Sequence, residues 1–266
     1  MNRNRIRLAA LAMTVAALAT ACSSNDSGSS ASDSSSPGSS ASGAPVTLTV
    51  FAAASLKKGF TEIAQDFEKA HPNVTVKTTF DGSSALVTQI KQGASADVIA
   101  TADQKTMTSL GADALDPTTF TRNVLTIITA PGNPKNITSV RDLARSGVTT
   151  VLCAPQVPCG NAAATVEKNT GVDIRPASEE TSVSGVVTKV TSGQADAGLV
   201  YTSDAKAAGS KVAAVNDPAF AAVVNEYPIA TVKGTQHAGE AKQFIDLVTG
   251  TEGQQVLNAL GFGAGR

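Results

Sequence analysis

The chain lacks tryptophan, has only two tyrosines and two histidines, and only 16% of its residues are charged. Binding proteins for sugars and apolar ligands usually present aromatic side chains, so this scarcity favours a small polar ligand. The formal net charge of −1 gives no sign of the basic face that binds nucleic acid, and we expect no nucleic-acid partner.

The chain also lacks any apolar run of the length that crosses a bilayer, about 20 residues. An N-terminal run from Leu8 to Ala21 is shorter and follows Arg3, Arg5 and Arg7. A basic start with a short apolar core is typical of a secretory signal peptide, which we assign to residues 1–21. The segment ending at Cys22 resembles the lipobox of bacterial lipoproteins, in which this cysteine would be lipidated. Ala19 stands where lipoboxes prefer leucine, so an ordinary signal peptide with an incidental cysteine is the alternative.

A linker follows this cysteine. Residues 23–44 are almost entirely Ser, Gly, Ala, Asp, Asn and Pro. Such a segment buries too little apolar surface to offset the entropy of ordering, so we predict a disordered tether over 22–45. The remaining residues are enough for one large domain or two lobes.

Cysteine is scarce as well, with three residues in the whole chain. If Cys22 is lipidated, Cys153 and Cys159 remain as a pair in an oxidising compartment, which favours a disulfide. Two free thiols are the alternative. A metal site is disfavoured because no histidine lies nearby in the sequence.

The remaining sequence alternates between strand and helix patterns. A first series is predicted as strand 46–52, helix 56–70, strand 74–80, helix 86–92 and strand 98–101. A second series comprises helix 140–145, strand 149–154, helices 161–170 and 183–192, and strand 197–201. Strands 123–130 and 227–232 would cross between the two series, and helix 238–249 would end the pattern. This order predicts an α/β protein of two lobes, each a mostly parallel sheet flanked by helices, with a ligand cleft between them. The lobes would be 46–127 plus 228–266, and 128–227.

Small polar residues stand at three predicted strand-to-helix junctions, represented by Ser55, by Ser83 with Ser84, and by Cys159 before Gly160. The first turn of a helix has free N–H groups and partial positive charge, and a serine hydroxyl adds a further donor. Several such termini around a cleft would bind an anion without lysine or arginine. Taken singly, each serine is also explained as an ordinary helix N-cap.

Ordered sequence blocks carry a resemblance over residues 46–262. They are Val50 to Leu56 (VFAAASL), Gly82 to Leu86 (GSSAL), Gly93 to Val98 (GASADV), Cys153 to Gly160 (CAPQVPCG) and Ala195 to Ala205 (ADAGLVYTSDA). In this set the chain resembles the periplasmic molybdate-binding proteins of the type II solute-binding fold. The resemblance implies a site of neutral donors around a tetrahedral dianion, either molybdate or tungstate, with no cofactor and with molybdenum bound only as the oxyanion.

The same resemblance implies which residues form the site. Ser55 and Ser83 would give hydroxyl and backbone N–H groups, Cys159 and Val183 backbone N–H groups, and Tyr201 its phenol. Ser84 occupies a position that is often glycine in the family, so Ser83 and Ser84 are hard to separate as hydroxyl donors. Donors alone would accept a fully deprotonated oxyanion and disfavour a protonated phosphate, which needs an acceptor.

These observations predict a monomeric extracytoplasmic lipoprotein, anchored to the outer face of the cell membrane, that delivers its anion to the permease of an ABC importer. The alternative within the same class is a sulfate-binding or other oxyanion-binding protein. A lipoprotein that signals to a sensor is a third interpretation. A secreted hydrolase would need His71 or His237 beside a serine nucleophile, and neither lies in a strand-end loop, so no enzyme activity is expected.

Overall fold

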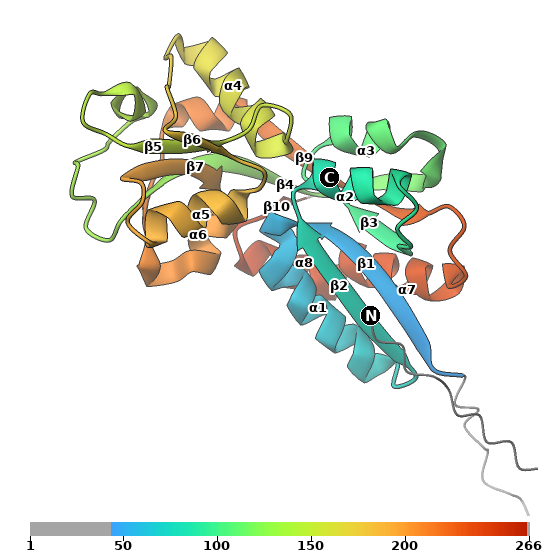
Figure 1. The fold of residues 1–266 in the computed structure, drawn as a ribbon. Helices are drawn as coiled ribbons and strands as arrows, with labels where there is room; N and C mark the ends of the chain where they lie inside the picture. The colour runs from blue at the N-terminus through green and yellow to red at the C-terminus, as the bar shows by residue number, and fades with distance from the viewer. Residues whose placement is uncertain (1–43, 265–266) are drawn as a thin grey trace, which may run out of the picture. The chain divides into compact units, whose positions relative to one another are not determined.

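The computed structural model describes residues 44–264 (Figure 1). The predicted signal peptide, the lipidation of Cys22 and nearly all of the predicted linker lie outside the described residues. Within residues 44–264, no helix is long and apolar enough to cross a membrane.

The strands of the described residues form one sheet with the order β2-β1-β3-β9-β4-β7-β5-β6. β8 and β10 lie off this path, and each pairs with β4. β1 pairs in parallel with β2 and β3, and β5 pairs in parallel with β6 and β7. The strands are β1 Val46–Ala53, β2 Val74–Asp81, β3 Val98–Ala100, β4 Ala114–Thr129, β5 Thr150–Cys153, β6 Ser178–Glu180, β7 Ala197–Tyr201, β8 Ala213–Val215, β9 Val224–Val232 and β10 Gly263–Ala264.

The two parallel groups are joined by the long antiparallel strands β4 and β9. The first part of β4 pairs with β9 from Ala114 to Val124, and its last part pairs with β7 from Leu125 to Thr129. β9 in turn pairs with β3. This arrangement fits the prediction that the strands near 123–130 and 227–232 cross between the two series, although β4 begins well before the predicted residue 123.

Helices cover both faces of the β1–β3 group, as expected for strands buried on both sides. Successive residues of a strand face opposite sides, so Val50 and Ala52 of β1 pack in one apolar cluster with Phe60 and Phe244. Phe51 packs on the other face, in a cluster with Leu86. The helices are α1 Lys57–Ala70, α2 Ser83–Lys91, α3 Gln104–Leu110, α4 Pro158–Thr170, α5 Val183–Thr191, α6 Thr202–Ala208, α7 Ala238–Thr249 and α8 Thr251–Ala259.

Two helices begin earlier than the sequence pattern predicts, and both differences matter for the site. α2 begins at Ser83 rather than near Leu86, and α4 begins at Pro158 rather than Asn161. Proline suits the first helical turn, where its missing N–H costs nothing. Ser83 and Cys159 therefore lie within the first turns of helices, where backbone N–H groups have no partner in their own helix.

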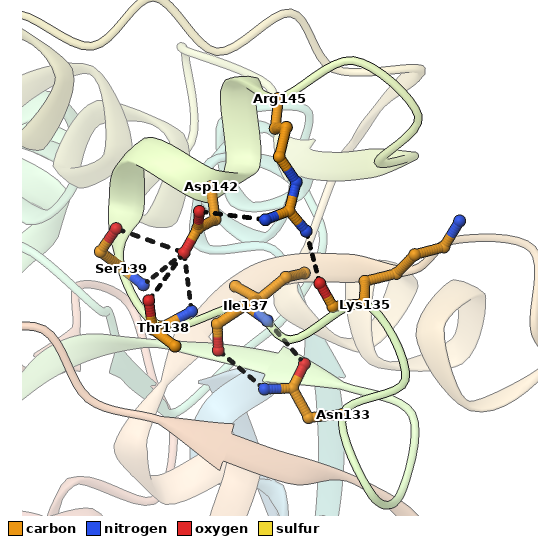
Figure 2. Close-up of polar contacts among 7 residues, drawn as sticks. All are labelled: Asn133, Lys135, Ile137, Thr138, Ser139, Asp142 and Arg145. Carbon is orange, nitrogen blue, oxygen red and sulfur yellow. Dashed lines mark hydrogen bonds and ion pairs between the residues drawn. The ribbon is translucent and has the colours of Figure 1, made fainter.

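The predicted helix at 140–145 is a 3-10 turn, Val140–Ala144, held by side chains (Figure 2). The Asp142 carboxylate accepts hydrogen bonds from the N–H and hydroxyl groups of Thr138 and Ser139. The Asn133 side chain donates to the carbonyl oxygen of Ile137 and accepts from its N–H. These side chains form hydrogen bonds with nearby backbone groups and so compete with the hydrogen bonds of an α-helix. The segment therefore remains a short 3-10 turn.

We call β1, β2 and β3 with α1, α2, α3, α7 and α8 the first half, and β5, β6 and β7 with α4, α5 and α6 the second half. Both halves belong to one unit, Ser42–Arg266.

Candidate functional site

The candidate residues lie where strands end. Ser55 is in the 3-10 turn Ala54–Leu56, which follows β1. Ser83 is the first residue of α2 and comes directly after Gly82, which follows β2. In the second half, Cys159 is in the first turn of α4 and Val183 starts α5. Tyr201 is the last residue of β7. Ligands of open α/β sheets bind beyond the carboxyl ends of strands, which is where these residues lie.

One small cavity of about 20 Å³ brings these elements together. A single water occupies about 10–15 Å³, so a space of this order suits one small ion rather than an extended molecule. The cavity contains no charged side chain among its lining residues, which are Ala53, Ala54, Ser55, Gly82, Ser83, Ala102, Val157, Pro158, Cys159, Thr181, Ser182, Val183 and Tyr201. Five of the six predicted ligand residues are therefore in this lining, and Ser84 is not.

The hydroxyl of Ser83 is set up to donate into the cavity. Its side chain is buried, with 2% exposed, and Oγ accepts a hydrogen bond from the backbone N–H of Ala102 at 3.0 Å. A hydroxyl has one hydrogen to donate. Because that oxygen already accepts from Ala102, the Ser83 hydrogen remains available to a ligand.

Tyr201 has a similar arrangement. The Asn225 side-chain amide donates to the Tyr201 hydroxyl oxygen at 3.0 Å, and the same amide donates to the carbonyl oxygen of Ala102 at 2.9 Å. The Tyr201 hydrogen can then turn toward the cavity or toward the neighbouring Tyr227 hydroxyl. Burial raises the pKa of Tyr201 well above its usual value, so the phenol keeps this hydrogen at neutral pH.

Tyr227 is a site residue that the sequence interpretation missed. It is fully buried on β9, its hydroxyl lies 3.0 Å from Ser55 Oγ, and its ring lies edge-on to that of Tyr201 at 5.8 Å between centroids. Burial also raises the pKa of Tyr227 well above its usual value. The composition could have drawn attention to Tyr227, because the chain has only two tyrosines and the other, Tyr201, was already a predicted site residue.

Ser84 has a different role from the one expected. Its hydroxyl donates to the carbonyl oxygen of Gln156 at 2.9 Å. The structure thus separates the two adjacent serines, with Ser83 in the cavity lining and Ser84 in contact with the loop before α4.

The loop before α4 is closed by a disulfide. Cys153 and Cys159 are joined with an S–S distance of 2.11 Å and a Cα–Cα distance of 5.7 Å. This bond ties the end of β5 to the first turn of α4. A Cβ atom at Gly160 would lie 1.9 Å from the carbonyl oxygen of Ala154, so this close loop needs glycine there. The disulfide and the glycine together fix the position of the Cys159 backbone.

A larger groove of about 550 Å³ shares Ala54 and Ser55 with the cavity and is also lined by Lys57, Lys58 and Lys211. Asp204 lies in the same lining, and one of its carboxylate oxygens accepts from the N–H of Tyr201 at 3.0 Å. Burial raises the pKa of Asp204 to about 7.

Neither histidine lines the cavity. His71 stacks on Phe67 at the end of α1, and His237 precedes α7. Within residues 44–264, no group of three or more His, Cys, Asp or Glu side chains could hold a metal ion. The lining supplies hydroxyl and N–H donors to a ligand but no general base beside a serine.

Residues 48–263 match the family described as bacterial extracellular solute-binding protein. The chain belongs to this family. Its members are solute-binding proteins, which confirms the interpretation of the chain as a binding protein rather than an enzyme.

This solute-binding protein is similar to known proteins both in sequence and in structure. The molybdate-binding protein ModA of Mycobacterium tuberculosis (strain H37Rv) is 47% identical over 219 residues, 81% of this chain and 84% of the relative. The periplasmic molybdate-binding protein of Azotobacter vinelandii matches in structure with a TM-score of 0.71 and 24% identity, over 81% of this chain and 98% of that one. The sulfate-binding protein SubI from Mycobacterium tuberculosis H37Rv matches with a TM-score of 0.66 and 21% identity, over 82% and 86%. These structures confirm the two-lobed α/β fold class.

Proposed function

We propose that this protein captures molybdate, and also tungstate, in the cavity between its two halves. The observation that carries the proposal is a small cavity lined by Ser55, Ser83, Cys159, Val183 and Tyr201 without any charged side chain. Buried donors hold a dianion strongly because water does not compete for them. The 47% identical relative named as a molybdate-binding protein supports the same ligand.

The donor set also supports a choice among oxyanions. Because no carboxylate lines the cavity, a protonated phosphate would have no charged acceptor for its O–H, which disfavours it against a fully deprotonated anion. Sulfate carries no such proton and is the second candidate, favoured by the fold that the chain shares with a sulfate-binding protein. Size then separates the larger molybdate and tungstate from sulfate.

The wider function follows from the ligand. We propose an extracytoplasmic, monomeric protein that needs no cofactor, is lipid-anchored through Cys22 and delivers the anion to the permease of an ABC importer. The proposed lobes are residues 46–127 plus 228–266, and residues 128–227, with hinge closure over the anion. The basic and apolar N-terminus, the lipobox-like segment and the linker composition support secretion and anchoring.

A thermal-shift panel tests the ligand. A ligand that binds only the folded state raises the melting temperature by mass action. We expect molybdate and tungstate to raise it at micromolar concentration, sulfate to do so only weakly, and phosphate to have no effect. Equal shifts with sulfate and molybdate would contradict the assignment of molybdate as the ligand, and no shift with any of these anions would contradict the oxyanion site.

A further inference from the structure

Gly82 lies in the cavity lining, at a place where the two halves approach each other closely. Its backbone angles are φ −57° and ψ 133°, which any residue adopts, so the turn itself does not require glycine. A Cβ atom at this position would lie 2.1 Å from the carbonyl oxygen of Thr181. Gly82 belongs to the first half and Thr181 to the segment between β6 and α5 in the second half. The missing side chain is therefore needed only for the contact between halves.

A second contact joins the halves close by. Ser84, two residues after Gly82, donates its hydroxyl hydrogen to the carbonyl oxygen of Gln156 at 2.9 Å. Gln156 lies between β5 and α4, in the loop that the Cys153–Cys159 disulfide closes. Ser84 Oγ does not line the cavity, so this hydrogen bond is separate from the donor set around the anion.

We propose that Gly82 sets how closely the two halves approach over the anion and that Ser84 fastens them in that position. The proposal rests on the proposed anion site and adds two residues that act on closure. A Cβ atom at residue 82 would force Thr181 away by more than about 1 Å, since packed atoms tolerate little overlap.

That displacement matters because the cavity is small. Val183 and Cys159 come from the second half, whereas Ser55 and Ser83 come from the first. Holding the halves apart lengthens the hydrogen bonds from one set of donors to an anion held by the other, and hydrogen bonds weaken steeply with length and misalignment. Glycine at residue 82 thus permits a cavity in which both sets reach the same small ion.

The test compares Gly82→Ala with Gly239→Ala. Gly239 lies on α7, its φ is not in the left-handed region, and a Cβ atom there would meet nothing within 4 Å. Molybdate affinity and dissociation rate are measured by calorimetry and stopped flow. We expect Gly82→Ala to lose at least about tenfold in affinity, mostly through faster dissociation, and Gly239→Ala to match the wild type. Far-UV circular dichroism and melting temperature check that both variants fold.

Ser84→Ala supplies a second variant that adds no atoms. It removes one neutral hydrogen bond, so we expect a loss of about two- to tenfold in affinity, again through dissociation. Wild-type affinity in both Gly82→Ala and Ser84→Ala would overturn the proposal.

A cross-linking measurement reads closure without any ligand. Cysteines introduced as Ser84→Cys and Gln156→Cys are cross-linked with a short bifunctional thiol reagent, and the linked peptides are identified by mass spectrometry. Ser84→Cys removes the Ser84 hydrogen bond from every sample, so the comparison tests Gly82 alone. We expect linkage to be slowed severalfold by Gly82→Ala and unchanged by Gly239→Ala. Equal linkage rates in both backgrounds would overturn the closure role, even if Gly82→Ala weakens binding by crowding the anion. If the wild type binds no anion, the proposed function fails, while this linkage still decides the role of Gly82.

Discussion

At the scale of single residues, hydrogen-bond direction is what makes the cavity suitable for an anion. Ser83 and Tyr201 each accept a hydrogen bond from a protein N–H group, which leaves their own hydrogens to donate. Ser55 shares a hydrogen bond with Tyr227, and either hydroxyl can be the donor. When Tyr227 donates, the Ser55 hydrogen is also free for the ligand.

Tyr201→Phe tests this arrangement. The change removes a donor to a charged ligand and leaves the Asn225 amide without one of its acceptors, so we expect anion binding to weaken by about 1–3 kcal/mol. Tyr227→Phe is the comparison variant, because Tyr227 does not line the cavity and acts on a ligand only through its neighbours Ser55 and Tyr201. We expect Tyr227→Phe to lose less affinity than Tyr201→Phe. Isothermal calorimetry with molybdate measures both, and unchanged affinity in Tyr201→Phe would exclude its hydroxyl from binding.

Some of these residues could be predicted from the sequence and others could not. Ser55 and Ser83 follow recognisable strand patterns and precede helical ones, so their place at strand ends was predictable. Tyr227 and Asn225 lie inside β9, where nothing in the local pattern marks a functional residue. Their partners are far away in the sequence, and only the pairing of β9 with β3 and β4 brings them to the site.

At the scale of elements, the disulfide loop is held in place by both a covalent bond and a close backbone contact. Cys153, Cys159 and Gly160 together fix the start of α4, where the Cys159 N–H lies free in the first turn. The sequence interpretation placed the start of this helix at Asn161, because the cysteine and proline residues look like loop. The disulfide connects the strand directly to the helical turn, so that the loop is shorter than its composition suggests.

Reduction of this disulfide should weaken both folding and binding. A closed loop of this size stabilises a protein by about 2 kcal/mol through the entropy of the unfolded chain. We expect a reductant to lower the melting temperature of the wild type and to reduce molybdate affinity, since the Cys159 backbone is then less fixed. The double variant Cys153→Ala, Cys159→Ala should show the lower melting temperature already and no further response to reductant. A wild-type response equal to that of the double variant would contradict this role.

The 3-10 turn at Val140–Ala144 gives a prediction outside the site. Hydrogen bonds from Thr138, with Ser139 and Arg145 adding to them, lower the pKa of Asp142. A carboxylate with a lowered pKa stabilises the fold above its ordinary titration range and loses that effect as the pH falls through its folded pKa. Asp142→Ala should therefore lower stability by about 1 kcal/mol at pH 7. Urea unfolding at pH 7 and pH 3 measures the difference from the wild type, which should shrink at the lower pH while anion binding at pH 7 stays unchanged.

At the scale of the whole molecule, the alternation of strands and helices follows from the sequence more readily than the lengths of the strands. Two βα series with two linking strands predict two parallel groups joined by crossing strands, because parallel strands require helical crossovers. The short strands β6 and β8 were missed, and the order of the strands in the sheet comes from the structure alone. The length of β4 was missed because its first part, from Ala114 to Thr119, is mostly exposed and contains Asp116 and Pro117, which are rare in strands. That part pairs with β9, and a long-range pairing of this kind leaves no signal in a short window of sequence.

Asp204 links the site to the stability of the whole molecule through its titration. Its folded pKa of about 7, raised by burial, lies above the ordinary value of 3.8. The folded state therefore binds this proton more tightly than the unfolded state, and the resulting stability is full below about pH 4 and is lost as the pH rises to about 7. Asn at this position still accepts from the Tyr201 N–H but does not titrate. We expect Asp204→Asn to be more stable than the wild type at pH 8, and this gap to close toward pH 5. Melting temperatures of both proteins from pH 4 to pH 9 measure the gap. A gap that is constant across this range would mean that Asp204 titrates with an ordinary pKa, and that the carboxylate beside Tyr201 stays charged whenever the anion binds.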